Sequence, residues 1–285
     1  MEALRKRFLT IYETKFFSIA PPNEIVELYN ELKAYLKVVD PALSQTDYMS
    51  LMHMLFDLCI YNGKDIEAQV IYKTLEDRFG DNSPYLHVMQ ATMMQVNEND
   101  VTAEKYLQEL LDRVLEYDTD ILDYLLVSKK LLSIRKRSLS REKYISELLN
   151  LSEKFPLDGE TWTALATEYL EAGQLDRAAF CLEEVLCIAP FNYICFAQLG
   201  EVLYYKALRD KKGKKDVLQD SLNNFLRSVE LSETYLKGWA FVAKITGILD
   251  GKKALHSLAK KKLEEINQNS DSHDHMIAKI ILDKL

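Results

Sequence analysis

The segment from residue 159 to 192 most constrains what this chain can fold into, because it holds one complete helix–turn–helix pattern. In its first half, an aromatic residue, a leucine and a tyrosine recur three and four residues apart, which places them on one face of a helix. A glycine then ends that helix, a small alanine lets a second helix approach closely, and a proline stops the second helix. These structural positions are Trp162, Leu165, Tyr169, Gly173, Ala178 and Pro190. The pattern predicts a pair of packed helices.

The same offsets recur along the chain with the period of about 34 residues that is typical of tetratricopeptide repeats. A downstream unit opens at Trp239, after a unit that is interrupted between residues 206 and 220, and an upstream unit repeats the turn glycine at Gly63. Weaker copies cover residues 86–110 and 121–151. The chain therefore resembles the tetratricopeptide repeat family. The expected fold is an all-α helical-repeat superhelix, an α-solenoid, of about six helix pairs.

Ordinary amphipathic helices are the alternative explanation for any one of the weaker copies, because every helix that packs on a core has apolar residues at a helical period. The two strong copies agree at more than that. Each has a glycine at the turn and an alanine five residues later, namely Gly63 with Ala68 and Gly173 with Ala178. Amphipathicity alone demands neither residue, so the agreement favours a repeat array.

The chain divides into three expected parts. Prolines flank an expected helix near the N-terminus, and residues 1–48 are interpreted as N-terminal capping helices that shield the end of the stack. Residues 49–267 are expected to form the repeat array, and residues 268–285 a linker followed by a final helix. No segment has the alternating β-branched pattern of a strand.

The sequence predicts no catalytic, cofactor-binding or metal site. It has no glycine-rich phosphate loop, no metalloprotease histidine motif and no nucleophile elbow. The most suggestive ligand cluster is Asp271, His273, Asp274 and His275, but residues two apart on a helix point away from each other. A polar linker is the preferred interpretation of that cluster, and a zinc site is the alternative. We expect that the protein is not an enzyme and needs no cofactor.

The chain is acidic, with 44 Asp and Glu residues against 36 Lys and Arg, which argues against general binding of nucleic acid. Two basic clusters occur in the interruptions of the array, at residues 135–143 and 209–215. They are either solvated loops or contacts for anionic lipid headgroups or for an acidic partner. The candidates for such a contact are Lys211, Lys212, Lys214 and Lys215.

No segment is predicted to cross a membrane, because the longest uncharged run, residues 185–200, is shorter than the roughly 20 apolar residues that a spanning helix needs. The first residues show no apolar core of a signal peptide. The cysteines have no CxxC spacing and fall at helix positions that are expected to be at least partly buried, which favours free thiols and the cytosol. They are Cys59, Cys181, Cys187 and Cys195.

In the absence of an active site, the concave face of the array is the predicted binding surface. Its mixed, partly aromatic lining suits an amphipathic helix or an irregular peptide. For Tyr204, packing between neighbouring repeats is an equally good explanation. The predicted partner contacts are Tyr61, Met94, Leu126, Thr163, Thr167, Tyr204 and Tyr205, and other lining residues include His53, Asp57 and His87.

The central unit resembles a narrower family more closely. Besides the repeat positions, the run Ala-Ala-Phe-Cys-Leu-Glu-Glu at residues 178–184, then Asn192, Glu201 and Val202, are similar to the subunit 2 family of the endoplasmic reticulum membrane protein complex. The resemblance is strongest over residues 156–205. The basic stretch near residue 212 is longer than the family pattern leads us to expect.

That resemblance implies a non-catalytic scaffold subunit of an insertase complex, held peripherally on the cytosolic face of the endoplasmic reticulum membrane. It implies partners that are membrane-spanning and soluble subunits of the same complex, and a role in the insertion of tail-anchored and multi-pass proteins. Neither nucleic acid nor an obligate homo-oligomer is expected. A free tetratricopeptide adaptor or co-chaperone that binds short peptides is the alternative, although Thr163 and Thr167 stand where the carboxylate clamp of co-chaperones has Lys and Asn.

Overall fold

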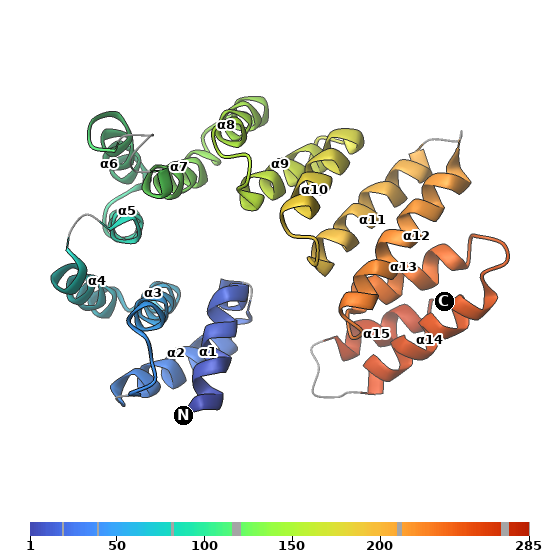
Figure 1. Ribbon diagram of the computed structural model, residues 1–285, viewed down its shortest axis with the longest axis horizontal. Helices are drawn as coiled ribbons and strands as arrows, with labels where there is room; N and C mark the ends of the chain where they lie inside the picture. The colour runs from blue at the N-terminus through green and yellow to red at the C-terminus, as the bar shows by residue number, and fades with distance from the viewer. Residues whose placement is uncertain are drawn as a thin grey trace. The chain divides into compact units, whose positions relative to one another are not determined.

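The chain is built from helices that follow one another in short turns (Figure 1). The computed structural model describes residues 1–18, 20–38, 40–80, 83–115, 121–209, 213–268 and 274–284, and these contain no strand. The all-α prediction is confirmed. The elements are α1 (Glu2–Thr14), η1 (Phe16–Ser18), α2 (Pro22–Lys37), α3 (Gln45–Tyr61), α4 (Asp65–Phe79), α5 (Pro84–Asn97), α6 (Asp100–Arg113), α7 (Ile121–Arg135), α8 (Arg141–Lys154), α9 (Gly159–Glu171), α10 (Leu175–Ile188), α11 (Tyr193–Arg209), α12 (Lys214–Leu231), α13 (Leu236–Thr246), α14 (Lys253–Gln268) and α15 (His275–Leu282).

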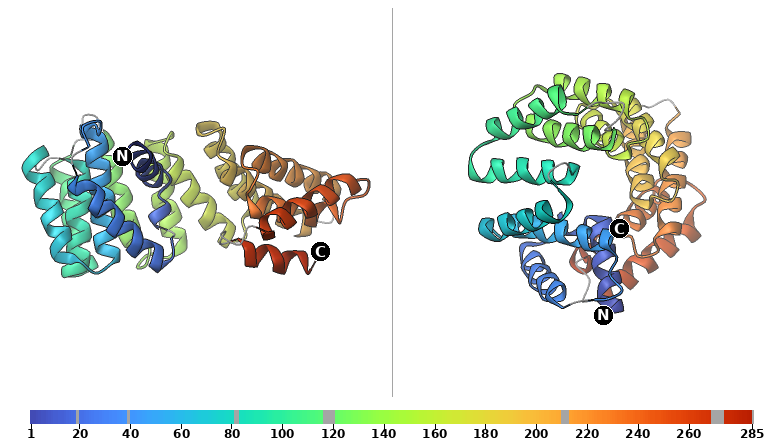
Figure 2. Two further views of the ribbon diagram at one scale, coloured as in Figure 1. Left: turned by 90° about the horizontal axis from the view of Figure 1, so that it is seen from below. Right: turned by 60° about the vertical axis from the view of Figure 1, so that its left-hand side comes forward.

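Two compact units divide the chain, Met1–Ser138 with α1 to α7 and Leu139–Leu285 with α8 to α15. Within the N-terminal unit, consecutive helices from α3 to α7 lie side by side (Figure 2). The predicted boundaries of cap, array and C-terminal segment stay predictions. The division into two compact units is a different one and falls between α7 and α8. Among the described residues, no helix is both long enough and apolar enough to cross a membrane.

The central pair α9 and α10 has the structure that its sequence predicts. Asp158 caps α9 by accepting a hydrogen bond from the backbone N–H of Thr161 at 3.0 Å. Gly173 forms the turn with a φ of 70°, in the left-handed region that favours glycine. Ala178 is fully buried where α10 packs on α9, and α10 ends at Ile188, two residues before Pro190. The short side chain and the turn glycine therefore set the close approach of the two helices.

In the N-terminal unit, α1 and α2 complete the core of the first repeat. Phe8, Leu32 and Phe56 are buried in one cluster with side chains of α3, α4 and α5. The first helix, α1, ends at Thr14, because Lys15 takes a left-handed conformation with a φ of 52° and a 3₁₀ turn follows. The side chains of Arg5 and Asp40 form an ion pair at 3.1 Å that ties α1 to the segment between α2 and α3.

In the C-terminal unit, buried hydroxyl groups occupy the repeat positions of α12. The Oγ of Ser221 donates to the carbonyl oxygen of Gly200 at 2.6 Å, and the Oγ of Ser228 donates to that of Tyr193 at 2.7 Å. Both bonds join α12 to α11, its partner in the repeat. Small hydroxyl residues therefore satisfy their own polarity while they let the two helices pack closely.

Candidate functional site

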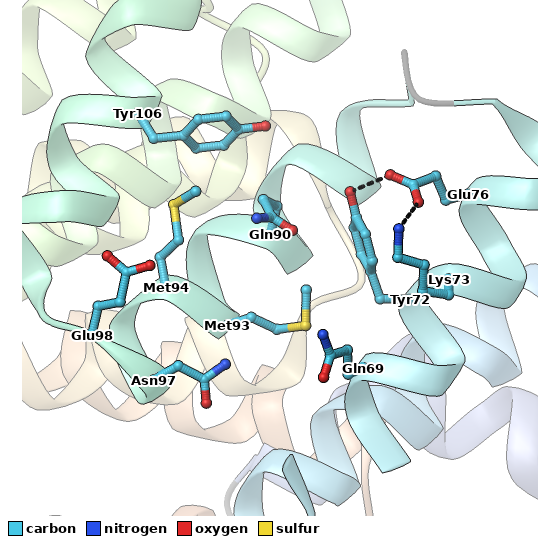
Figure 3. A pocket seen from close by; sticks show the side chains of 10 residues that line it. All are labelled: Gln69, Tyr72, Lys73, Glu76, Gln90, Met93, Met94, Asn97, Glu98 and Tyr106. Carbon is cyan, nitrogen blue, oxygen red and sulfur yellow. Dashed lines mark hydrogen bonds and ion pairs between the residues drawn. The ribbon is translucent and has the colours of Figure 1, made fainter. Parts of the chain in front are cut away.

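The residues that could bind a partner lie in several places, one of which is a pocket between α4, α5 and α6 with a volume of about 440 Å³ (Figure 3). Its lining combines carboxamides, two methionines, two tyrosines and a few charged groups. Carboxamides offer both donors and acceptors, as the backbone of an extended peptide requires, and methionine adapts to irregular apolar shapes. The lining residues are Gln69, Tyr72, Lys73, Glu76, Gln90, Met93, Met94, Asn97, Glu98 and Tyr106.

One wall of this pocket is fixed by a hydrogen-bonded group on α4. The hydroxyl of Tyr72 donates to Oε1 of Glu76 at 3.0 Å, and Nζ of Lys73 lies 3.0 Å from Oε2 (Figure 3). These hydrogen bonds, Lys73 first, hold the pKa of Glu76 below its ordinary value. The carboxylate is thus charged at neutral pH, and its two oxygens are already engaged by side chains of its own helix.

A second, smaller pocket of about 180 Å³ lies between α1, α3, α4 and α5. The ring of His53 is flanked by Tyr12 and Tyr85, with centroids 6.2 and 5.5 Å away. Its Nδ1 is buried and has no hydrogen-bond partner among the described residues. Burial lowers the pKa of His53 and raises that of Asp57, one turn further along α3. The pocket is lined by Tyr12, Thr46, Met49, Ser50, His53, Leu75, Tyr85, Leu86 and Met89.

The predicted groove residues of the N-terminal unit are only partly accessible. Tyr61 is exposed at the end of α3, with its ring 6.5 Å from that of Phe17. Met94 is half-buried and lines the larger pocket, and Leu126 is half-buried on α7. Their role in partner binding stays a prediction.

The predicted groove residues of the C-terminal unit differ sharply in exposure. Thr163 and Thr167 donate their hydroxyl groups to backbone carbonyl oxygens one turn earlier, at 2.8 and 3.0 Å. Tyr205 is 43% exposed, but Tyr204 is 4% exposed and packs its ring 5.4 Å from that of Phe241. Of the two explanations open for Tyr204, the structure shows packing between α11 and α13.

Some side chains of the basic insertion near residue 212 contact other parts of the chain. Lys211 and Lys212 lie outside the described residues, while Lys214 and Lys215 are exposed at the start of α12. Nζ of Lys215 lies 3.5 Å from a carboxylate oxygen of Asp250, and Arg209 donates to the carbonyl oxygen of Gly173 at 3.0 Å. These contacts favour a solvated segment over a free basic patch, although lipid contact at the exposed lysines stays a prediction.

The other basic cluster also binds carboxylates of neighbouring helices. Arg135 contacts Glu104 at 2.7 Å across α7 and α6, and Arg141 contacts Glu171 at 2.8 Å across α8 and α9. Both ion pairs are partly exposed, so each stabilises the fold by at most about 1 kcal/mol. Their guanidinium groups serve to join neighbouring helices.

An exposed apolar set in the C-terminal unit was missed by the sequence reasoning. Leu157 is 81% exposed and Phe191 is 73% exposed, in the loops before α9 and before α11. Each directly follows a proline, and they stand one repeat of 34 residues apart, which is the signal that could have found them. Phe180, also exposed, has its ring 6.2 Å from that of Trp162. Contiguous apolar patches mark protein contact surfaces, and these side chains are candidates for such a patch.

The cysteines are free thiols with different exposures. Cys59, Cys181 and Cys195 are buried, as predicted, but the prediction of at least partial burial is wrong for Cys187. Cys187 lies in the last turn of α10, one residue before that helix ends, where its side chain faces solvent. A thiol at the edge of the C-terminal unit is therefore accessible.

No group of three or more His, Cys, Asp or Glu side chains in the described part of the chain is arranged to hold a metal ion. Of the polar cluster near the C-terminus, Asp271 and His273 lie outside the described residues. His275 contacts the carbonyl oxygen of Asn267 through its Nδ1.

Comparison with known proteins gives relatives of this chain, and one of them matches its whole length. The chain is 45% identical over its whole length to ER membrane protein complex subunit 2 of Saccharomyces cerevisiae, of which it covers 99%. It is 26% identical to the TPR repeat protein oca3 of Schizosaccharomyces pombe, over 78% of this chain and 74% of that protein. It is also 33% identical to ER membrane protein complex subunit 2-A of Xenopus laevis, over 34% of this chain and 31% of that protein. No family model matches the chain.

Solved structures agree in fold. The C-terminal part of a TPR repeat-containing protein from Cytophaga hutchinsonii matches 96% of this chain and 98% of its own with a TM-score of 0.53 and 13% identity. PilF of Pseudomonas aeruginosa matches 80% of this chain and 96% of its own with a TM-score of 0.51 and 11% identity. These likenesses confirm the tetratricopeptide type of the helical repeat.

Proposed function

The chain belongs to the family of ER membrane protein complex subunit 2, and from that membership we propose that it is a non-catalytic scaffold subunit of an endoplasmic reticulum membrane complex. It lies on the cytosolic face of the membrane and is held there through its partners. These are membrane-spanning subunits, whose cytosolic segments it binds, and a soluble subunit. The complex inserts tail-anchored and multi-pass proteins into the membrane. This chain supports that insertion and has no catalytic site of its own.

The identity of 45% over the whole length is the observation that carries the proposal, because it covers both units and leaves no part of the chain unmatched. The surfaces described above support it further. Pockets in the N-terminal unit and exposed apolar side chains in the C-terminal unit give two separate places for partner segments. A scaffold needs several such surfaces, whereas a free adaptor needs only one.

The repeat array binds as a prefolded surface. Its helices are held by buried side chains such as Ala178 and Trp239 before any partner arrives. Most of the conformational entropy that is lost on binding therefore comes from the partner segment, and little comes from the scaffold. This division of the entropy cost lets several short segments assemble on surfaces that are already folded.

Depletion of this chain from cells tests the proposal. A tail-anchored reporter with a lumenal glycosylation site should lose much of its glycosylated form, and a secreted reporter should keep its own. Re-expression of the chain should restore insertion, while Ala178→Phe, which forces α9 and α10 apart, should not. Unchanged insertion of the reporter in cells without the chain would exclude the insertase role.

A further inference from the structure

Two histidine–tyrosine sets stand one repeat apart in the N-terminal unit. His53 on α3 and His87 on α5 are separated by 34 residues, and so are Tyr72 on α4 and Tyr106 on α6. In each repeat the tyrosine follows the histidine by 19 residues. Equivalent positions in a repeat array have equivalent neighbours, so both pairs are expected to meet.

Only the second pair meets. Nδ1 of His87 and the hydroxyl of Tyr106 share a hydrogen bond of 2.9 Å, with ring centroids 6.3 Å apart. In the first repeat, the hydroxyl of Tyr72 instead donates to Glu76 at 3.0 Å (Figure 3). The residue equivalent to Glu76 in the second repeat is Leu110, which has no acceptor. Tyr72 thus bonds a carboxylate of its own helix, and Nδ1 of His53 has no hydrogen bond to it.

The result is a buried ring nitrogen without a partner. Nδ1 of His53 is buried and makes no hydrogen bond to any described residue. Such orphaned groups are rare in folded proteins and costly, which makes a missing partner the physical explanation. A neutral imidazole can donate from one nitrogen and accept at the other, so a hydroxyl group suits Nδ1 in either tautomer.

The space beside His53 has the size and polarity of an aromatic ring. The pocket measures about 180 Å³, and an apolar cavity of about 150 Å³ is enough to take up benzene. Its walls are Tyr12, Tyr85, Leu86 and Met89, which offer the edges, faces and polarisable sulfur that an aromatic ring prefers. The pocket thus presents mostly apolar walls, with the hydroxyl groups of Thr46 and Ser50 and the ring of His53 among them.

We propose that this pocket receives a tyrosine side chain of a partner protein, whose hydroxyl group bonds Nδ1 of His53 as Tyr106 bonds His87. The tyrosine replaces the contact that Tyr72 gives up to Glu76. The proposal rests on the scaffold function above, because it supplies one anchor by which a partner segment docks on the N-terminal unit. Buried tyrosines with a satisfied hydroxyl are frequent anchors of protein interfaces.

The full-length chain titrated with p-cresol, the side chain of tyrosine, tests the pocket directly. Histidine ring signals in NMR spectra should shift for His53 and not for His87, whose Nδ1 is already bonded. Toluene, which lacks only the hydroxyl, should bind about fivefold more weakly, as the loss of one hydrogen bond implies. Equal binding of the two compounds, or no shift of the His53 signals up to the solubility limit of p-cresol, would refute the proposal.

Two variants remove the remaining explanations. His53→Phe keeps a ring and should bring p-cresol down to the affinity of toluene; an unchanged preference for p-cresol would show that the hydroxyl binds elsewhere. Tyr72→Phe should leave the His53 signals of the free protein in place. If they move instead, Tyr72 itself bonds His53 in solution and no partner tyrosine is needed. Circular dichroism checks that both variants keep their helix content.

Isolation of the chain from its own cells separates this proposal from the scaffold function. If wild-type protein brings down membrane subunits and His53→Phe loses one of them, both proposals are supported. If the two proteins bring down the same subunits in the same amounts, the scaffold holds and the tyrosine anchor is wrong. If wild-type protein brings down none, the scaffold fails, and the p-cresol titration still decides whether the pocket accepts a tyrosine ring.

Discussion

At the scale of single residues, two adjacent tyrosines of α11 lie in different environments. Tyr204 is enclosed by Phe241 and by the ammonium group of Lys244, which lies 5.0 Å from its ring centroid, whereas Tyr205 is 43% exposed. Helical geometry turns neighbouring residues by about 100°, so one of the two faces the next repeat and the other faces solvent. The sequence shows two tyrosines, and only the structure separates them.

Alanine variants of these tyrosines should separate stability from binding. Tyr204→Ala leaves a cavity in the C-terminal core and should cost about 3–5 kcal/mol of unfolding free energy. Tyr205→Ala should change that free energy by less than about 0.5 kcal/mol and weaken partner binding. Denaturant unfolding and co-purification measure the two effects. Equal losses of stability in both variants would contradict the assignment of Tyr204 to the core and Tyr205 to the surface.

Cysteine reactivity should follow burial. Burial raises the pKa of Cys59 and Cys181 to about 11 and that of Cys195 to about 12, so these thiols are protonated and enclosed at neutral pH. We expect a maleimide to label Cys187 alone in the folded protein and all four thiols in denaturant. Mass spectrometry counts the adducts, and Cys187→Ser is the control that should take up none. Rapid labelling of a second site in the folded chain would show that the cores are more open than described.

At the scale of elements, close helix packing depends on residues without side chains. A Cβ added at Gly200 would lie 2.8 Å from the ring of Phe225, which is fully buried and stacked on Phe241 at 4.6 Å. Because that ring is buried and stacked, a shift that makes room for a Cβ would disturb its packing. The approach of α11 to α12 therefore depends on this glycine.

Gly200→Ala should destabilise the protein by about 1–3 kcal/mol through overpacking. Gly159→Ala is the matched control, because a Cβ at Gly159, the first residue of α9, meets nothing within 4 Å. That control should be neutral or slightly stabilising, since alanine favours a helix more than glycine does. Thermal unfolding of both variants measures the difference. A Gly200→Ala protein as stable as the wild type would show that Phe225 can shift.

Helix pairing could be predicted from sequence where local residues determine it. Gly173 and Ala178 set the turn and the close contact of α9 and α10 within one repeat, so the pattern alone predicted that pair. The burial of Tyr204 depends on Phe241, a residue of another helix. The unpaired nitrogen of His53 depends on which acceptor Tyr72 chooses. Tertiary packing decides which partner such a side chain contacts, and this leaves no periodic pattern in the sequence.

At the scale of the whole molecule, each unit buries its own core and presents its own surfaces. In the described part of the chain, the N-terminal unit offers two pockets lined by α1 and by α3 to α6, and the C-terminal unit offers exposed apolar loops and an exposed thiol. The family pattern predicted the fold and the general role from the central repeat. It could not predict the pockets, because they arise from differences between repeats rather than from what the repeats share.

Purification of the tagged chain after mild detergent extraction, with quantification of every protein that elutes with it, tests the central claim most directly. The scaffold account predicts several membrane-spanning proteins and at least one soluble protein in amounts equal to that of the chain. The same pattern should persist when Lys214 and Lys215 are changed to Glu, if protein partners rather than lipid hold the chain at the membrane. A chain that elutes alone, or only with chaperones, would contradict the account and favour a free peptide-binding adaptor.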